Sequence, residues 1–182
     1  MACFIRLVPF RDVGNLPFEA LTETLNEVFG LPIEVAKQIP LLEEAYDSAR
    51  SQWRAESLLE SICHTCKEKR VICLGLTTKD CYADSLNFVF GLARNRPPCA
   101  LVATARLDPS FYGEGENPAL FLRRLATETV HEIGHTLGLD HCPDPHCVMH
   151  FSNTLADTDR KGYRFCPRCR ARVEEALAPC RV

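Results

Sequence analysis

The stretch HEIGHTLGLDH, residues 131–141, decides the fold of this 182-residue chain. It contains the pattern HExxHxxGxxH, in which two histidines stand four residues apart and a third follows a glycine. Helical residues four apart point in nearly the same direction, so His131 and His135 can face one ion. Gly138 adopts a positive φ at little cost, so we expect it to end the helix and bring His141 round as the third ligand.

Three imidazole ligands leave one coordination position open, which is typical of catalytic zinc sites and not of structural ones. Glu132 lies next to the face that carries His131 and His135, so it could act on a zinc-bound water as general base and acid without ligating the ion. A chance match, with the histidines on a solvated surface, is the alternative interpretation. The glycine and the third histidine favour the metal, and these residues predict a zinc hydrolase.

A long helix is expected to carry this stretch. Asn117 followed by Pro118 is typical of a helix start, and apolar residues recur at helical spacing from Leu122 to Ile133. We therefore expect the active-site helix over about 118–137.

Apolar runs of strand length precede this helix, and prolines or polar residues separate them. The expected strands cover about 2–8, 33–39, 71–76, 86–92 and 100–105, and the other expected helices cover about 17–29, 43–62 and 167–178. This order predicts an α/β (α+β) fold with a twisted, mostly parallel five-stranded sheet and two long helices.

Beyond Gly138 the composition changes to cysteine, histidine, proline and aspartate, with little apolar material for a core. We expect one metalloprotease domain with an N-terminal subdomain over 1–138, a small C-terminal subdomain over 139–182, and a substrate cleft between the two. Four cysteines in the second part have the spacing Cys-x4-Cys and Cys-x2-Cys; they are Cys142, Cys147, Cys166 and Cys169. Four thiolates predict a closed structural zinc site, while an iron–sulfur cluster or two disulfides are the alternatives.

The combination HExxHxxGxxHCx4CxM followed by CxxC resembles the archaemetzincins, also called archaelysins, a family of the metzincin clan of zinc proteases. The resemblance covers residues 131–169 closely. It implies a metzincin-like fold, Glu132 as catalytic acid and base, and Met149 as the turn methionine beneath the metal. It also implies two sets of zinc ligands: His131, His135 and His141 at the catalytic ion, and Cys142, Cys147, Cys166 and Cys169 at the structural one.

One position departs from the pattern of the clan. Some metzincins carry a tyrosine two residues after the turn methionine, where it can stabilise the oxyanion, whereas this chain has Phe151 there. Tyr163 is a candidate substitute, with an ordinary surface or core tyrosine as the alternative. Met149 also has a plain alternative, because methionine commonly fills gaps in cores.

The formal net charge of −3 and a pI near 6.1 argue against a nucleic-acid binder, which would need clustered basic residues. The N-terminal apolar run is too short for a signal segment or a membrane span. The eleven cysteines are odd in number and partly close-spaced, which favours metal thiolates in a reducing compartment and hence a cytoplasmic location. The state of seven cysteines is left open, namely Cys3, Cys63, Cys66, Cys73, Cys81, Cys99 and Cys180. Intracellular proteins of hyperthermophiles can carry disulfides, so pairing among Cys3, Cys73, Cys81, Cys99 and Cys180 is one alternative. Cys63 and Cys66 could form a redox pair, half a metal site or an incidental disulfide, or their spacing could be a coincidence.

These features together predict a zinc-dependent metallopeptidase with two zinc ions. We expect it to act as a monomer on peptide or small-protein substrates, with exopeptidase and endopeptidase action both open. The rival interpretation is a zinc-stabilised peptide-binding protein whose protease-like site is inactive or latent.

Overall fold

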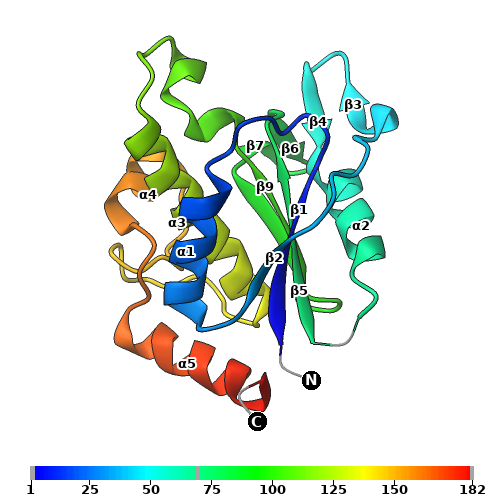
Figure 1. The fold of residues 1–182 in the computed structure, drawn as a ribbon. Coiled ribbons are helices and arrows are strands. Elements are labelled where there is room, and N and C mark those ends of the chain that lie inside the picture. The colour runs from blue at the N-terminus through cyan, green and yellow to red at the C-terminus, as the bar shows by residue number, and fades with distance from the viewer. Residues whose placement is uncertain (1–2, 69, 181–182) are drawn as a thin grey trace.

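The fold is a mixed α/β arrangement built on a largely parallel sheet, as expected (Figure 1). The computed structural model describes residues 3–68 and 70–180, so residue 2, where the first strand was expected to begin, lies outside it. The main sheet consists of β1 (Phe4–Pro9), β2 (Ile33–Val35), β5 (Val71–Thr77), β8 (Gly91–Arg94) and β9 (Cys99–Ala103). Its order is β2-β1-β5-β9-β8. β1 pairs in parallel with β2 and β5, and β5 in parallel with β9.

The last strand, β8, runs antiparallel to β9 and forms one edge of the sheet. Helix α3 (Pro118–Thr136) confirms the expected active-site helix to within one residue and packs against β8 and β9. The edge strand and the helix that carries the zinc motif are therefore neighbours.

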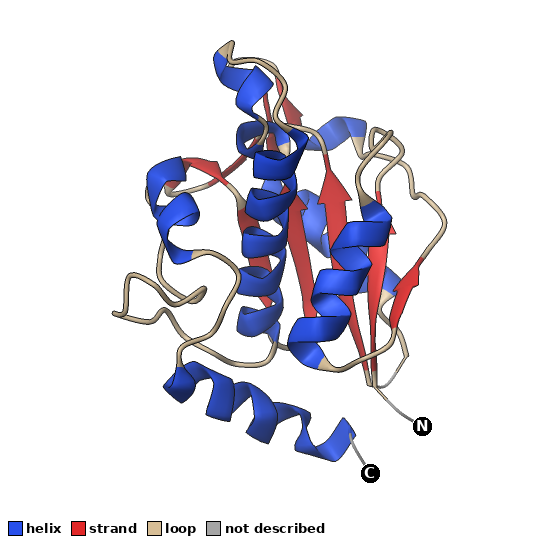
Figure 2. Cartoon of the chain, turned by 60° about the vertical axis from the view of Figure 1, so that its left-hand side comes forward, coloured by secondary structure: helices blue, strands red, loops and turns tan. Residues whose placement is uncertain are grey.

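Helices cover both faces of the main sheet. Helix α1 (Phe18–Phe29) and α3 lie on one face, and α2 (Ala55–Thr65) lies on the other (Figures 1 and 2). Strand β5 is accordingly buried at every residue, as expected for a parallel strand covered on both sides. Its side chains alternate, so that Leu74 joins the core under α1 and α3 while Cys73 joins the core under α2.

The helix expected over 43–62 is wrong in its first half. Residues Glu43–Ala45 form a 3-10 turn, and a hairpin of β3 (Tyr46–Asp47) and β4 (Gln52–Arg54) precedes α2. The carboxylate of Asp47 accepts hydrogen bonds from the backbone N–H groups of the two residues that turn the hairpin, Ala49 and Arg50. Local side-chain bonding and strand pairing thus replace the helical turns there.

The strand expected over 86–92 divides between two sheets. Strands β3, β4, β6 (Cys81–Ala83) and β7 (Leu86–Val89) form a second sheet in that order. Val89 pairs with Cys81 in this second sheet, whereas Gly91 pairs with Val102 in the main one. The short strand β6 was not predicted, because three residues carry too weak a pattern.

The chain after α3 contains α4 (Leu155–Lys161) and α5 (Pro167–Leu177). Helix α5 confirms the helix expected over 167–178 to within one residue. Thr154 caps α4 in a capping box with Asp157, since each side chain bonds the other residue's backbone N–H. Helix α5 lies across one end of the main sheet (Figure 2). Further 3-10 turns cover Ala105–Leu107, Pro109–Tyr112 and Ala178–Cys180.

Two disulfides connect distant parts of the chain. One joins Cys3 to Cys180 and the other joins Cys63 to Cys99. Cys63 and Cys66 are therefore not bonded to each other, and Cys66, Cys73 and Cys81 are free thiols.

Among the described residues, no helix is both long and apolar enough to cross a membrane.

The packing of α2 on β5 predicts the effect of Gly75→Ala. An added Cβ would lie 2.5 Å from Cγ1 and 2.7 Å from Cδ1 of Ile62, which is fully buried. We expect a loss of about 1–3 kcal/mol in the free energy of unfolding, measured by chemical denaturation, because the core is overpacked. Gly115→Ala is the matched control, since an added Cβ there meets nothing within 4 Å. Equal stability of the two variants would contradict this account of the packing.

Candidate functional site

The ends of helix α3 fix the direction of the zinc motif. At its start, Asn117 accepts a hydrogen bond from the backbone N–H of Leu120, and Pro118 occupies the first turn. At its end, Gly138 has a φ of 84°, and the N–H of Leu139 bonds back to the carbonyl of Gly134. The chain therefore reverses at the glycine, as the sequence predicted.

The reversal brings the three histidines of the motif together. The ring centroids of His131 and His135 lie 4.6 Å apart, and that of His141 lies 5.5 Å from the first and 4.8 Å from the second. One ligand atom from each ring lies within 4.8 Å of the others. The Nε2 atoms of His131 and His135 are 3.1 Å apart, close to the separation of about 3.3 Å between nitrogens on a tetrahedral zinc with Zn–N bonds of about 2.0–2.1 Å.

Backbone carbonyls orient two of these rings. Nδ1 of His131 lies 2.6 Å from the carbonyl oxygen of Val148, and Nδ1 of His135 lies 2.7 Å from that of Leu139. A ring that donates from Nδ1 keeps the lone pair of Nε2 for an ion. Burial is the main cause that lowers the pKa of both rings and of His141, so the neutral form that binds metal is favoured.

Glu132 is buried beside the histidines. Burial, and secondly the carboxylate of Glu128, raise the pKa of Glu132 well above its usual range. Its side chain packs on strand β8, where an added Cβ at Gly91 would lie 2.5 Å from Cγ of Glu132. Gly91 was not predicted as a site residue, although a glycine inside a strand can indicate the close approach of another group.

Met149 lies directly against the helix that carries the ligands. It is fully buried, and an added Cβ at Gly134 would collide with its sulfur atom. Its carbonyl accepts a hydrogen bond from the N–H of Cys142, which holds the turn against the segment that follows His141. The methionine thus occupies the position beneath the histidines that the resemblance implied.

A buried ion pair behind His131 was not predicted. The ammonium of Lys161 lies 3.2 Å from a carboxylate oxygen of Glu128, and both side chains are at most 3% exposed. The same ammonium donates to the carbonyl of His150 at 3.1 Å and lies 3.3 Å from Nδ1 of His131. Thr158 adds a hydrogen bond of 2.8 Å to Glu128. No short motif joins these residues, because Lys161 follows His131 by thirty positions.

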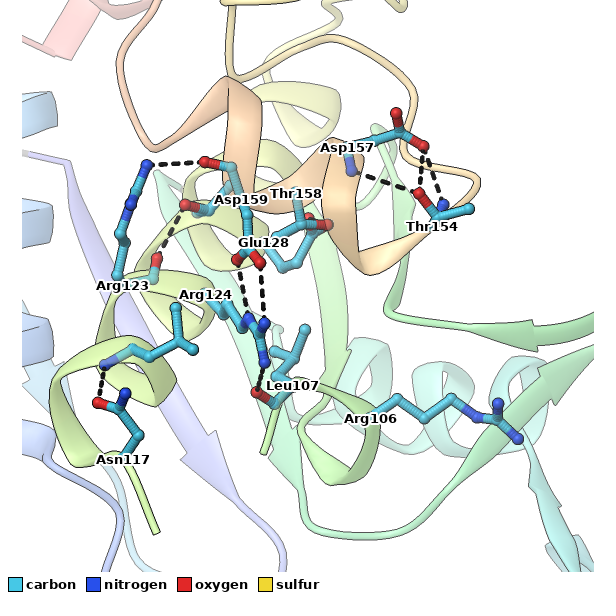
Figure 3. Close-up of polar contacts among 12 residues, drawn as sticks. Arg106, Leu107, Asn117, Arg123, Arg124, Glu128, Thr154, Asp157, Thr158 and Asp159 are labelled. Carbon is cyan, nitrogen blue, oxygen red and sulfur yellow. Dashed lines mark hydrogen bonds and ion pairs between the residues drawn. The ribbon is translucent and has the colours of Figure 1, made fainter. Parts of the chain in front are cut away.

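A second ion pair links α3 to α4 farther from the histidines (Figure 3). The guanidinium of Arg124 donates to both carboxylate oxygens of Asp159 at 2.8 Å, and Arg123 donates to the backbone carbonyl of Asp159 at 2.7 Å. These bonds fix α4, and with it Lys161, relative to the motif helix.

The four cysteines of the C-terminal segment also converge. Their sulfur atoms lie within 4.8 Å of one another, and all four thiols are unpaired, which disfavours the two-disulfide alternative; they are Cys142, Cys147, Cys166 and Cys169. The backbone N–H of Cys166 donates to the sulfur of Cys147, and Arg168 donates to that of Cys142. Four sulfur atoms gathered at this distance match the four ligands of a closed zinc site, so this group fits a metal ion.

A cavity of about 810 Å³ covers the histidines and Glu132. Strands β7 and β8 form one wall, and residues 151–153 form part of the other. The ring of Phe151 lies 4.9 Å from that of His141, at the position where some metzincins carry tyrosine. Tyr163 packs against the main core and is not among the described residues that line the cavity, so the geometry disfavours it as the substitute.

Comparisons with known proteins agree with this geometry. The model of Peptidase family M54 matches residues 20–175. Archaemetzincin from Pyrococcus furiosus is 36% identical over 97% of this chain and 95% of its own length. The crystal structure of archaemetzincin from Methanopyrus kandleri is 38% identical, with a TM-score of 0.84 over 97% of this chain and 96% of that one.

A zinc-dependent peptidase from Methanocorpusculum labreanum is 28% identical, with a TM-score of 0.83 over 93% of this chain and 99% of that one. Both the family model and these relatives span the zinc motif and the cysteines. The chain therefore belongs to Peptidase family M54, together with these archaemetzincins, and is a zinc metallopeptidase.

Proposed function

We propose that the chain hydrolyses peptide bonds with Glu132 as general base and general acid, at a catalytic zinc bound by His131, His135 and His141. The observation that carries this proposal is the convergence of the three rings beside a buried carboxylate on the floor of a cavity. When bound, the zinc would supply Lewis-acid chemistry by polarising the scissile carbonyl and making water more acidic.

The side chains of the site would perform the remaining steps. The carboxylate of Glu132 accepts a proton from the attacking water and later delivers it to the nitrogen of the leaving amine. The raised pKa of Glu132 suits both roles, since a proton taken up is retained until it is delivered. No covalent bond forms between the enzyme and the substrate in this sequence.

Strand β8 would hold the substrate. It is the edge strand of the main sheet, and Gly91, Leu92 and Ala93 line the cavity. An extended peptide can add to a sheet edge through main-chain hydrogen bonds. The scissile bond would then lie over the histidines, because α3 packs directly beneath β8.

A second zinc would bind the four thiols of Cys142, Cys147, Cys166 and Cys169. A site with four protein ligands is closed to substrate, so its role would be structural. It would stabilise the C-terminal segment together with the apolar residues that this segment adds to the core, among them Val148, Met149 and Leu177. Because thiolate ligands require reduced cysteines, we propose a cytoplasmic location, where the two disulfides would be of the kind that intracellular proteins of hyperthermophiles carry. We also propose a monomer that binds neither nucleic acid nor membranes.

The rival proposal, a peptide-binding protein with an inactive or latent site, predicts the same two metals. A measurement of peptide cleavage distinguishes the two proposals, since the peptide-binding protein would show no cleavage that depends on Glu132.

Glu132→Gln should keep the catalytic zinc and lower kcat for peptide hydrolysis at least about 100-fold, because proton transfer by a positioned group typically contributes about 10²–10⁴-fold. Digestion of a peptide library with and without a zinc chelator, read by mass spectrometry, measures this. Glu23→Gln on the exposed face of α1 is the control and should remain active. Undiminished, chelator-sensitive cleavage by a pure Glu132→Gln preparation would refute the assigned role.

Elemental analysis should find about two zinc ions per chain, in keeping with one open and one closed zinc site. Cys169→Ser should lose one of them and lower the Tm, because the closed site contributes folding free energy. His141→Ala should also lower the zinc content but should leave the Tm closer to that of the wild type. A wild-type content of one zinc would contradict the two-site proposal.

Lys161→Met should lower stability by about 3–5 kcal/mol, because it leaves the Glu128 carboxylate buried without its cation. Zinc affinity at the histidines should fall about 10–100-fold, since Lys161 fixes the carbonyl of His150 next to the methionine turn. Denaturation and zinc competition titrations measure the two effects. The double variant Lys161→Met with Glu128→Leu should recover part of the stability, and simple additivity of the two losses would contradict the pairing.

A further inference from the structure

The cavity over the histidines extends to a carboxylate that the proposed reaction does not use. Glu56, in the first turn of α2, lines the same cavity as Glu132 and the three histidines. Helix α2 belongs to the opposite face of the main sheet from α3, so the motif gave no indication of this residue. Glu56 reaches the cavity beside the turn between β6 and β7.

One oxygen of this carboxylate has a partner and the other has none. Oε1 of Glu56 accepts a hydrogen bond of 3.2 Å from the backbone N–H of Asp84. Oε2 is buried and has no hydrogen-bond partner among the described residues. A buried carboxylate oxygen without a donor is unfavourable, and Glu56 as a residue lines the substrate cavity. A turn of the side chain would bring this oxygen to a donor that the substrate supplies.

The other acidic groups of the cavity are accounted for. Glu128 is paired with Lys161, Glu132 is assigned to the reaction, and Asp140 is exposed to solvent. Among the described residues that line the cavity, there is no lysine or arginine.

The basic residue closest to Glu56 in sequence is Arg54, whose pKa is raised first by a side-chain hydrogen bond with Tyr82, then by the charge of Asp84, and last by that of Glu56. Its guanidinium bonds the carboxylate of Asp84 at 2.7 Å, and Arg54 itself does not line the cavity. The charge of Glu56 is therefore without a basic partner inside the cavity.

The wall beside Glu56 is apolar. Ala83, Leu86 and Val89 line the cavity along β6 and β7, and the Leu86 side chain is 45% exposed. Lysine and arginine side chains combine an aliphatic stem with a cationic end. A stem along Leu86 would direct the cation to Oε2 of Glu56.

We propose that Glu56 is a specificity-determining residue that selects peptides with a lysine or arginine side chain on the β6–β7 side of the scissile bond. This rests on the proposed peptidase function of the same cavity. A substrate α-ammonium offers the same cationic nitrogen, but it lacks the aliphatic stem that the apolar wall fits.

The test compares three synthetic peptides that differ at one position. That position is found first by selecting a peptide library for binding to zinc-loaded Glu132→Gln protein and by digesting the same library with the zinc-loaded wild type. The position carries lysine, its uncharged isostere norleucine, or glutamate. We expect kcat/KM to be about tenfold higher for lysine than for norleucine, mainly through KM, as a half-buried charge pair would give. N-terminal acetylation of the peptides should leave the preference for lysine unchanged. If acetylation abolished this preference, Glu56 would bind the substrate α-ammonium instead, and the proposal would be overturned.

Glu56→Gln keeps the shape of the side chain and should abolish the preference for lysine while leaving cleavage of the norleucine peptide unchanged. Glu56→Lys should reverse the preference toward glutamate. Glu60→Gln, one turn farther along α2 and exposed, is the matched control and should behave as the wild type. An equal loss on the lysine and norleucine peptides in Glu56→Gln would mean a structural role and overturn the proposal.

Binding measurements keep this test independent of turnover. Isothermal titration of the three peptides into zinc-loaded Glu132→Gln protein should give the same order of affinity, and Glu56→Gln on that background should remove it. Preference in binding without cleavage by the wild type would refute the peptidase proposal but support Glu56 as the cation site. Cleavage without any preference for a basic residue would support the peptidase proposal but refute Glu56 as the cation site.

Discussion

The polar face of helix α3 has to be buried, and the rest of the structure depends on how that burial is made possible. Glu128, His131 and Glu132 are each at most 5% exposed, in a helix that also forms the main core. Buried polar groups are unfavourable unless they have partners. The partners of Glu128 and His131 come from the chain beyond the motif, namely the carbonyl of Val148, the hydroxyl of Thr158 and the ammonium of Lys161.

The C-terminal segment in turn depends on α3. It adds more apolar side chains to the core than its composition suggested, among them Val148, Met149 and Leu177, and it also forms polar bonds to α3 and holds the cysteine group. Cys142 directly follows His141, and Cys147 lies two residues before Met149. Ordering of the sulfur cluster therefore orders the turn beneath the histidines, so the proposed structural metal would support the proposed catalytic one through a few covalent links.

The cavity above the histidines is made by elements that the motif does not contain. Strand β8 supplies a free sheet edge, and Gly91 leaves room for Glu132 to lie against it. The β6–β7 hairpin and the start of α2 extend the cavity toward Glu56. The proposed chemistry and the proposed selectivity thus come from different parts of the chain, in keeping with the frequent placement of binding residues on loops.

The sequence by itself indicated the two groups of candidate ligands and the helix that carries two of the histidines, because both follow from local spacing. His131 and His135 share a helical face, Gly138 turns the chain, and α3 begins at Pro118 as expected. Strands buried on both faces, such as β5, were also predictable from the sequence, because they are continuous apolar runs. Tertiary structure decided the rest, because pairing partners far apart in sequence leave no periodic signal. The β3–β4 hairpin replaced an expected helix, the 86–92 run divided between two sheets, and Lys161 and Glu56 reached the site only through packing.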